Sequence, residues 1–335
     1  MKVNRELLLK EVEAVMPGLS KKELIEQSSC VVFKDKKIHT YNDEVACSYD
    51  TEIALEGAIQ AAPLAELLRR RKDEELEIEP VKGALSVKGK RFKSSIRMEK
   101  EVLLPINAIK EPKKWKKLPT TFTDALKYVI SCAGKDESQF ALTCVHVNPD
   151  FIEACDNQQV SRYKLKTGFK KPILIRKDAL RYLLSLDMTE FGETKNWVRF
   201  RNPSGLVLSC RRYMEDYPDM SAILKVSGAK TVLPKGIKDA VSCAEIFSSE
   251  NVDDNTITVD LSKNKLKISG EGASGTYEEN KKIQYKGDNI SFRIPPTLLV
   301  ELVNKSNEYE VTADRLKIEF DKLTYVTALK IPSEK

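Results

Sequence analysis

The feature that most constrains this chain is a threefold repetition of one pattern. In each copy a helix-like segment, strand-like runs, a second helix-like segment and further strand-like runs follow one another. Such repetition decides the architecture of the whole chain, because each copy forms one structural unit. Each copy opens with apolar residues at helical spacing. These residues are Leu8, Val12, Val15 and Leu19 in the first copy, Phe122, Ala125, Leu126, Val129, Ile130 and Ala133 in the second, and Ile237, Ala240, Val241 and Ala244 in the third.

The later parts of each copy also correspond. Strand-like runs follow the opening helices at 30–33, 140–147 and 256–261, and polar turns are predicted at 42–43, at 156–157 and within 270–275. The second helices begin near prolines in the first and third copies, where the missing N–H of proline costs no hydrogen bond. In the second copy, residues 176–184 keep the helical spacing without proline. Alternating strands close each copy and predict antiparallel hairpins with one buried face.

This order predicts an α+β fold of three repeated domains, each with two helices packed on antiparallel sheets. Basic, partly proline-containing linkers at 110–119 and 225–230 place the domains at 1–117, 118–229 and 230–335. With 41% hydrophobic and 32% charged residues, the chain can bury cores and keep a solvated surface. The first residues lack the apolar run of a signal peptide, and no membrane-spanning stretch occurs. We therefore expect a soluble, cytoplasmic protein that does not associate with membranes.

The sequence offers little for catalysis, so we expect no enzyme activity, no cofactor and no metal. The seven cysteines form no CxxC motif and several lie in apolar runs, which is typical of buried thiols in a reducing compartment. Residues 270–275 match GxGxxG, but the next residues read as turn and strand, without the helix N-terminus that would hold a pyrophosphate. His39 and His146 lie in strand-like runs without a paired carboxylate motif, which is more typical of structural residues than of general bases.

A net charge of +6 mildly favours an anionic partner such as nucleic acid, although many proteins without one carry such a charge. A resemblance is more informative. The order and spacing of several segments resemble the bacterial-type DNA sliding clamp, the beta subunit of DNA polymerase III. These segments are Met1-Lys2-Val3 with 5–8, residues 61–83 with Leu67-Leu68-Arg69, residues 140–160, Asp216-Tyr217-Pro218-Asp219 and residues 325–329.

The chain departs from that family in two respects. The family's Thr-Asp-Gly-His-Arg motif is replaced by Cys155-Asp156-Asn157-Gln158-Gln159, and the chain is basic where clamps are usually acidic. We interpret it as a divergent member, of the kind that a phage or mobile element could encode.

The resemblance implies that two chains join head to tail into a homodimeric ring around double-stranded DNA, which it holds without sequence preference. The inner-wall cations would then be Lys10, Arg69, Arg70, Arg71, Lys127, Arg181, Lys235, Lys238 and Lys305. The run at 69–71 has a second reading, as charges that complement a helix C-terminus. The resemblance also places Phe92 of one chain against Ile246 and Phe247 of the other; the alternative is that Phe92 packs in the core of its own domain.

The resemblance further implies a pocket that takes a short peptide with hydrophobic anchors from the replicative DNA polymerase or the clamp loader. Carried over by position, its residues are Leu142, Cys155, Asn157, Gln158, Gln159, Val160, Pro218, Ile223, Val326 and Ala328. The main prediction is therefore a processivity factor that encircles DNA. Two alternatives remain: a clamp-like decoy or regulator that docks a polymerase or loader without forming a ring, and an enzyme on a repeated α+β scaffold.

Overall fold

The computed structural model describes residues 1–234, 236–248, 255–306 and 308–329. Their contacts divide them into two compact units. Unit 1 comprises Met1–Leu126, Cys144–Pro149 and Lys166–Glu215, and unit 2 comprises Lys127–Thr143, Asp150–Leu165 and the described part of Asp216–Lys335. The finer division into three domains at 1–117, 118–229 and 230–335 stays a prediction.

The helices begin where the apolar stripes predict them. Asn4 caps the first helix, because its side-chain oxygen accepts a hydrogen bond of 3.0 Å from the backbone N–H of Leu7. The helix predicted over 176–184 has only four α-helical residues and continues as a 3-10 turn over Arg181–Leu184. The α-helices of the described residues are α1 (Arg5–Val15), α2 (Ala61–Arg70), α3 (Phe122–Val129), α4 (Lys177–Leu180), α5 (Ile237–Ser248) and α6 (Pro296–Lys305).

Unit 1 is built on one large sheet whose paired strands run antiparallel. Its strand order is β1-β6-β7-β8-β5-β2-β3-β4-β16-β15-β14-β9. Two further strands of this unit, β10 (Cys144–Val147) and β13 (Ile173–Arg176), pair antiparallel with each other. The strands of the large sheet are β1 (Lys2–Asn4), β2 (Cys30–Lys34), β3 (Lys37–Tyr41), β4 (Val45–Asp50), β5 (Gly57–Gln60), β6 (Glu75–Val81), β7 (Ala84–Lys88), β8 (Lys93–Glu99), β9 (Lys116–Lys117), β14 (Glu190–Glu193), β15 (Trp197–Arg201) and β16 (Val207–Arg211).

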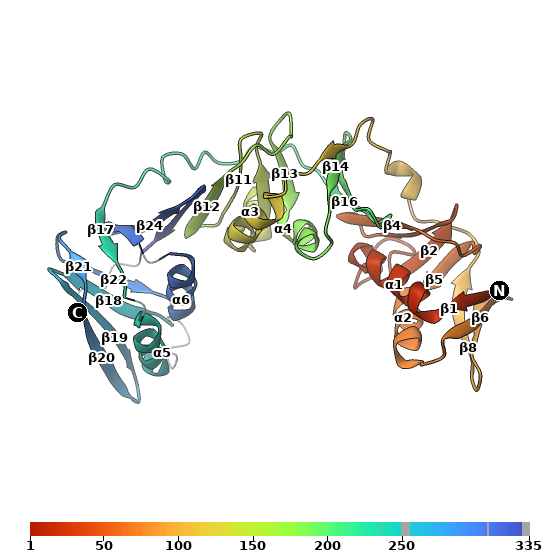
Figure 1. Cartoon of the computed structure of the whole chain (residues 1–335), viewed down its shortest axis with the longest axis horizontal. Coiled ribbons are helices and arrows are strands. Elements are labelled where there is room, and N and C mark those ends of the chain that lie inside the picture. Colours follow the sequence, from red (N-terminus) through yellow and green to blue (C-terminus); the bar gives the residue numbers. More distant parts are fainter. Residues whose placement is uncertain (235, 249–254, 307, 330–335) are drawn as a thin grey trace. The chain divides into compact units, whose positions relative to one another are not determined.

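Helices α1 and α2 pack side by side on this sheet (Figure 1). Helix α1 contacts β3 and β4, and α2 contacts β2 and β5. The apolar stripes of both helices are buried, including Leu8, Val12 and Leu68. Arg5 ties the two helices together, because its guanidinium donates hydrogen bonds to the backbone oxygens of Leu68 (3.0 Å) and Asp73 (3.1 Å) at the end of α2. The apolar spacing in the sequence thus corresponds to the buried faces of the helices.

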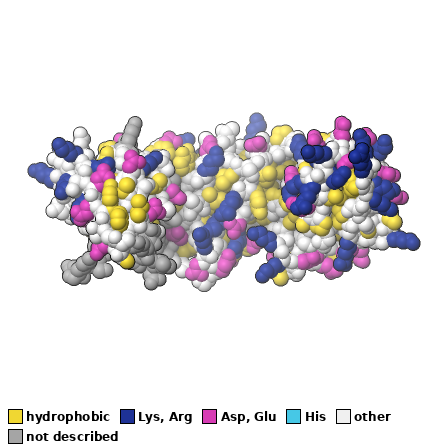
Figure 2. All heavy atoms as spheres, turned by 90° about the horizontal axis from the view of Figure 1, so that it is seen from below, with side chains coloured by type: hydrophobic (Ala, Val, Ile, Leu, Met, Phe, Trp, Pro, Cys, Tyr) yellow, Lys and Arg dark blue, Asp and Glu magenta, His cyan; other side chains and the backbone are white. Residues whose placement is uncertain are grey.

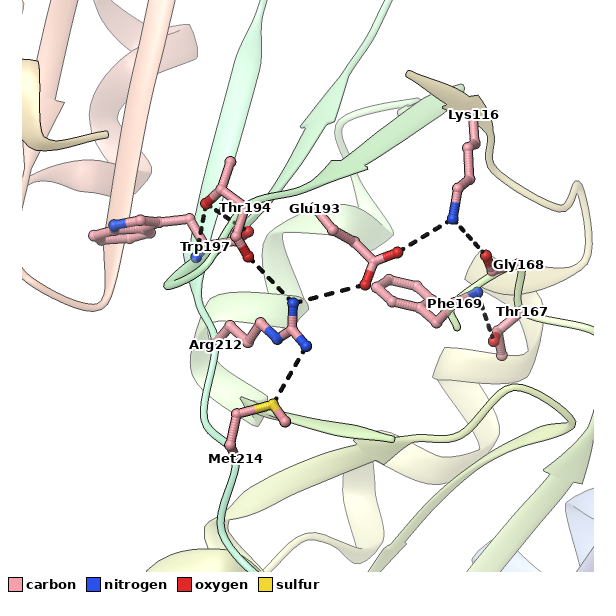
Figure 3. Close-up of polar contacts among 9 residues, drawn as sticks. All are labelled: Lys116, Thr167, Gly168, Phe169, Glu193, Thr194, Trp197, Arg212 and Met214. Carbon is pink, nitrogen blue, oxygen red and sulfur yellow. Dashed lines mark hydrogen bonds and ion pairs between the residues drawn. The ribbon is translucent and has the colours of Figure 1, made fainter. Parts of the chain in front are cut away.

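The basic linker at 110–119 is anchored on unit 1 by a polar cluster (Figure 3). The Nζ atom of Lys116 donates to the backbone oxygen of Gly168 (2.9 Å) and to the Glu193 carboxylate (3.2 Å). Arg212 approaches the same carboxylate at 3.7 Å and donates to the backbone oxygen of Thr194 at 3.2 Å. Gly192 allows the linker to lie close to β14, since a Cβ atom there would come within 2.6 Å of the Pro112 ring.

Unit 2 contains two antiparallel arrays of strands. The first has the order β11-β12-β25-β24-β23-β17-β21, and the second has the order β20-β19-β18-β22. The strands are β11 (Phe151–Cys155), β12 (Gln159–Lys164), β17 (Ala229–Val232), β18 (Ile257–Ser262), β19 (Lys265–Gly272), β20 (Gly275–Lys282), β21 (Gln284–Tyr285), β22 (Ile290–Ile294), β23 (Glu308–Val311), β24 (Arg315–Phe320) and β25 (Leu323–Ala328).

Helix α5 lies against β18, β19 and β20 and beside α6 (Figure 1). Gly270 of β19 makes the close approach of α5 possible, because a Cβ atom at this position would overlap the backbone of Ala244. The glycine-rich stretch 270–275 belongs to the β19–β20 hairpin, as predicted, and the strand β20 follows it rather than a helix.

The prediction of a strand over 140–147 is wrong for the first half of this segment. Residues Glu137–Thr143 form 3-10 turns with a kink at Gln139, and β10 begins only at Cys144. Two local hydrogen bonds account for this difference. The Thr143 hydroxyl donates to the backbone oxygen of Phe140 (2.7 Å), and the Gly134 N–H donates to the backbone oxygen of Leu142 (2.7 Å). The backbone is therefore bonded within its own segment where a strand would need a neighbour.

The cysteines lie as the apolar runs predict. Six of them are buried, Cys243 on α5 is partly exposed, and all seven are free thiols. Both histidines lie in strands, His39 in β3 and His146 in β10. Among the described residues, no helix has the length and apolar character needed to cross a membrane.

Candidate functional site

The turn between β11 and β12 lies at the centre of the candidate site, and Asp156 organises it. One carboxylate oxygen of Asp156 accepts hydrogen bonds from the backbone N–H groups of Gln158 and Gln159, both at 2.8 Å. The Asp156 N–H in turn donates to the backbone oxygen of Gln159 at 3.0 Å. Aspartate is a frequent residue at such turns, because its side chain can bond the backbone two and three residues further on. The sequence change at 155–159 thus preserves a well-formed turn.

The two glutamines of this turn have different environments. The Gln159 side-chain oxygen accepts a hydrogen bond of 2.6 Å from the hydroxyl of Tyr325, and its NH₂ group donates to Asp156 at 3.2 Å. Tyr325 is fully buried, so Gln159 provides the hydrogen-bond acceptor that its buried hydroxyl needs. Gln158 and Asn157 have exposed side chains. These two amides are therefore the most accessible of the turn.

Cys155 contributes an apolar wall. It is buried together with Val160 and Val326 in a cluster that also holds Met220. The hydroxyl of Tyr217 lies 3.1 Å from the Cys155 sulfur. Burial is the main cause that raises the pKa of the Cys155 thiol to about 11, so the thiol is protonated at neutral pH and is a poor nucleophile.

Two hollows flank the turn, and all of their lining residues belong to unit 2. The smaller hollow has a volume of about 170 Å³ and is lined by Cys155, Asp156, Asn157, Gln158, Gln159, Val160, Met220, Ile223, Arg315, Val326 and Ala328. The larger one has a volume of about 450 Å³ and is lined by Ser131, Ala133, Gly134, Lys135, Asp136, Gln139, Leu142, Asp156, Asn157, Gln158 and Gln159. Residues 156–159 line both hollows and form their shared wall.

Most pocket residues predicted from the sequence therefore lie together. Pro218 is an exception, because it lines neither hollow and is exposed. Leu142 lines only the larger hollow. The sequence prediction missed Met220, Arg315 and Lys135. Arg315 could have been found from strand register, because it pairs across β24 and β25 with Ala328, which was predicted.

The predicted DNA-binding cations are distributed over the helices. Lys10 lies on α1, Lys127 on α3 and Lys238 on α5, and all three are exposed. Arg181 is exposed at the start of the 3-10 turn that follows α4, and Lys305 is the last residue of α6. Lys235 lies outside the described residues. On the face shown in Figure 2, Lys and Arg side chains lie among Asp and Glu side chains.

The arginine run at the end of α2 is paired with carboxylates of the same unit. Arg69 bridges Glu13 (2.7 Å) and Glu66 (3.1 Å), and Arg70 also contacts Glu66 at 3.2 Å. Arg71 pairs with Asp73 at 2.9 Å. The Arg70 side chain is 81% exposed, so its ion pair is weak and its charge is the most accessible of the three.

The three predicted interface residues differ in exposure. Phe92 is half-buried, and the Arg71 guanidinium lies 4.1 Å from the centre of its ring. Phe92 therefore packs partly within unit 1, which is the alternative reading of this residue. Ile246 is 64% exposed on α5, and Phe247 stacks on Tyr277 of β20 with a distance of 6.5 Å between ring centres.

The arrangement of these elements is that of the DNA sliding clamp, as comparison with solved structures shows. The beta subunit of DNA polymerase III from Thermotoga maritima has a TM-score of 0.84 at 14% identity, with 99% of each chain covered. The beta chain from Streptococcus pneumoniae has a TM-score of 0.84 at 16% identity, with 98% of each chain covered. The Pseudomonas aeruginosa sliding clamp bound to griselimycin has a TM-score of 0.81 at 16% identity, with 98% of each chain covered.

These likenesses confirm the predicted α+β fold and its resemblance to the beta sliding clamp over nearly the whole chain. The low identity confirms that the sequence is divergent. Neither models of known protein families nor curated proteins gave a match.

Proposed function

We propose that this protein is a DNA sliding clamp, a processivity factor without catalytic activity that encircles duplex DNA and tethers a polymerase. The observation that carries the proposal is the likeness of the fold to beta sliding clamps over 98–99% of the chain. Because fold alone does not determine function, the site residues must support the proposal separately.

The size of the expected ring is compatible with DNA. Two copies of a three-domain chain would place twelve helices around the hole. At about 10 Å per helix, the circle through their axes is roughly 120 Å around and roughly 38 Å across. Subtracting one helix width leaves an opening of about 28 Å, which accommodates a duplex with a layer of water.

The positions of the cations support DNA binding. Each of the helices α1, α2, α3, α5 and α6 carries at least one cation of the predicted set, and Arg181 follows α4 directly. A ring that slides needs diffuse attraction to phosphates rather than contacts with bases. Single cations dispersed among carboxylates satisfy that requirement better than one dense basic patch would.

The two hollows beside the 156–159 turn support the tethering of partners. The wall of the smaller hollow combines apolar side chains with polar groups, as is typical of sites that bind peptides or small molecules, whereas the larger hollow is lined mostly by polar residues. The smaller hollow, of about 170 Å³, fits one large apolar side chain. We propose that a replicative polymerase and a clamp loader each insert a peptide with hydrophobic anchors here.

The decisive experiment combines oligomeric state with DNA topology. Sedimentation at micromolar concentration should give a dimer. Protein placed on nicked circular DNA by a clamp loader should stay there through gel filtration and slide off after the circle is cut. Equal retention on circular and linear DNA would contradict the ring.

The same experiment separates the alternative function. A decoy or regulator would bind a polymerase-derived peptide yet sediment as a monomer and show no retention on circles. Binding of the peptide by a dimer that also stays on circles would exclude the decoy.

A further inference from the structure

We infer that the pocket selects an extended peptide whose apolar anchors are flanked by Asp or Glu, and that Arg315 and Lys135 determine this selectivity. The inference rests on the proposed function, because it takes the two hollows beside the 156–159 turn as the peptide site. It goes further in assigning a charge to the partner and in naming two cations that the sequence prediction did not include.

The two cations lie on opposite sides of the shared wall. Arg315 lines the smaller hollow and Lys135 lines the larger one, whereas residues 156–159 line both. A peptide that fills both hollows must therefore cross the turn between them. Its two ends then lie near Arg315 and Lys135, respectively.

The acidic residues of the site are already satisfied within the protein. The Asp156 carboxylate accepts two backbone hydrogen bonds of 2.8 Å and one of 3.2 Å from the Gln159 amide. One Asp136 oxygen accepts hydrogen bonds from the N–H (2.9 Å) and the hydroxyl (2.7 Å) of Ser138, and these bonds lower the Asp136 pKa. Both carboxylates thus serve their turns: Asp156 accepts with both of its oxygens and Asp136 with one.

Lys135 and Arg315 have fewer and weaker contacts within the protein than these carboxylates have. Lys135 is exposed and, among the residues that the structure describes, has no ion-pair partner. Arg315 lies 3.5 Å from Asp314, with side-chain exposures of 41% and 59%, so solvent weakens this pair. Its planar guanidinium can bind a carboxylate through two parallel hydrogen bonds, which an ammonium group cannot do.

Apart from Asp156, whose carboxylate is held by the turn, the wall between the cations carries no charge. Gln158 and Asn157 present exposed amides, which can bond a peptide backbone of any sequence. The apolar wall of Cys155, Val160 and Val326 accepts anchors but does not discriminate charge. Discrimination between peptides with equal anchors therefore depends on Arg315 and Lys135, since electrostatic complementarity mainly provides specificity.

The test uses the full chain and three capped, fluorescent peptides with identical Leu and Phe anchors, flanked on both sides by Asp, Asn or Lys. Fluorescence anisotropy at about 50 mM salt should show the Asp peptide binding at least ~10-fold more tightly than the Asn peptide, and the Lys peptide more weakly than both. The advantage should shrink as salt rises, because these charges are exposed to solvent.

Charge reversal then assigns the effect to residues. Arg315→Glu and Lys135→Glu should each reduce the affinity for the Asp peptide roughly 10-fold or more and leave the Asn peptide within about 2-fold. Lys263→Glu is the matched control, because Lys263 is exposed in the turn between β18 and β19 and lines neither hollow. It changes net charge equally and should have little effect.

The outcomes separate the two proposals. If all three peptides bind with equal affinity and neither reversal matters, the charge selectivity is wrong but the pocket stands. If Lys263→Glu weakens the Asp peptide as much as the pocket variants do, the effect comes from net charge and the assignment is wrong. If no peptide binds, both the selectivity and the proposed peptide site are wrong.

Discussion

Gln158 and Gln159 are adjacent in sequence yet differ in what their side chains do. Gln159 accepts the hydroxyl of the fully buried Tyr325, whereas Gln158 contributes its backbone to the sheet through a hydrogen bond of 2.7 Å from Ala328 N–H. The Gln158 side chain is exposed. A substitution at each position therefore tests two different physical roles within one turn.

We expect Gln159→Ala to lower the free energy of unfolding by about 1–3 kcal/mol, because it removes the hydrogen bond of 2.6 Å that the buried Tyr325 hydroxyl donates to Gln159. Urea unfolding measured by circular dichroism provides the value. Gln158→Ala is the control and should change the free energy of unfolding by less than about 0.5 kcal/mol. Equal effects of the two substitutions would show that the Tyr325 hydrogen bond contributes nothing.

His39 makes the stability of unit 1 depend on pH. Burial is the main cause that lowers the pKa of His39 to about 4, well below its ordinary value. Between these two pKa values the unfolded chain binds the proton and the folded chain does not, so stability falls as pH falls.

We expect this group to cost on the order of 2 kcal/mol of stability when the pH falls from 7 to about 4. Unfolding curves of the native chain and of His39→Gln should be recorded across that range. The native chain should lose more stability than the variant as the pH falls. A pH-independent difference would mean that His39 has the same pKa in both states.

Single residues of the site were predictable where they lie on strands in the segments that resemble the sliding clamp. Cys155, Val160, Val326 and Ala328 lie in one pocket wall, as the resemblance implied. Arg315 was not predicted, although its register opposite Ala328 could have indicated it. Met220 was not predicted, because its place depends on the path of the chain outside the strands. Neither leaves a periodic signal in the sequence.

At the scale of elements, Gly270 determines how closely α5 can pack on β19. We expect Gly270→Ala to lower the free energy of unfolding by about 1–3 kcal/mol, because the added Cβ would overlap the Ala244 backbone and α5 would have to move. Gly236→Ala is the control, since its Cβ would meet only the end of the Lys281 side chain, at 3.7 Å. Thermal unfolding compares the two, and similar midpoints would contradict this packing role.

The end of α2 allows a second comparison, between two neighbouring arginines that have different contacts. Arg70→Ala should reduce the magnitude of the salt slope of DNA association by about 1, because Arg70 is the most exposed arginine there. Arg71→Ala should instead reduce stability by about 1 kcal/mol through the loss of its contact with Phe92. Binding titrations at several salt concentrations test the first expectation and urea unfolding tests the second. An unchanged slope for Arg70→Ala would leave this arginine as a helix-end charge only.

The elements themselves were largely predictable, because helical periodicity in a long amphipathic segment is a strong signal. The segment 140–147 shows the limit. A short apolar run fits a buried strand and a buried turn equally well, and the hydrogen bonds of Thr143 and Gly134 decided between them.

At the scale of the whole molecule, the order and spacing of helices and strands were sufficient to predict the clamp fold, since every copy of the pattern had to fit the same architecture. The ring was not predictable in the same way. The proposed ring would be a property of two chains, and it would depend on surfaces that a single sequence presents without a partner.

We expect Ile246→Glu to raise the dimer dissociation constant at least ~10-fold, because it would bury a charge in the proposed interface. Leu24→Glu is the matched control, since Leu24 is also an exposed apolar residue, at 89% against 64% for Ile246. Sedimentation velocity over a range of concentrations measures both. A dimer that withstands Ile246→Glu would place the interface elsewhere.

The burial of six cysteines has a practical consequence for the remaining one. Cys243 is the only partly exposed thiol of the chain and lies on the same helix as Ile246. A maleimide dye should therefore attach to the native protein at one position without engineering. If α5 contacts a second chain, the rate of labelling should fall as protein concentration rises. The labelling rate of Cys243 would then measure the association of two chains.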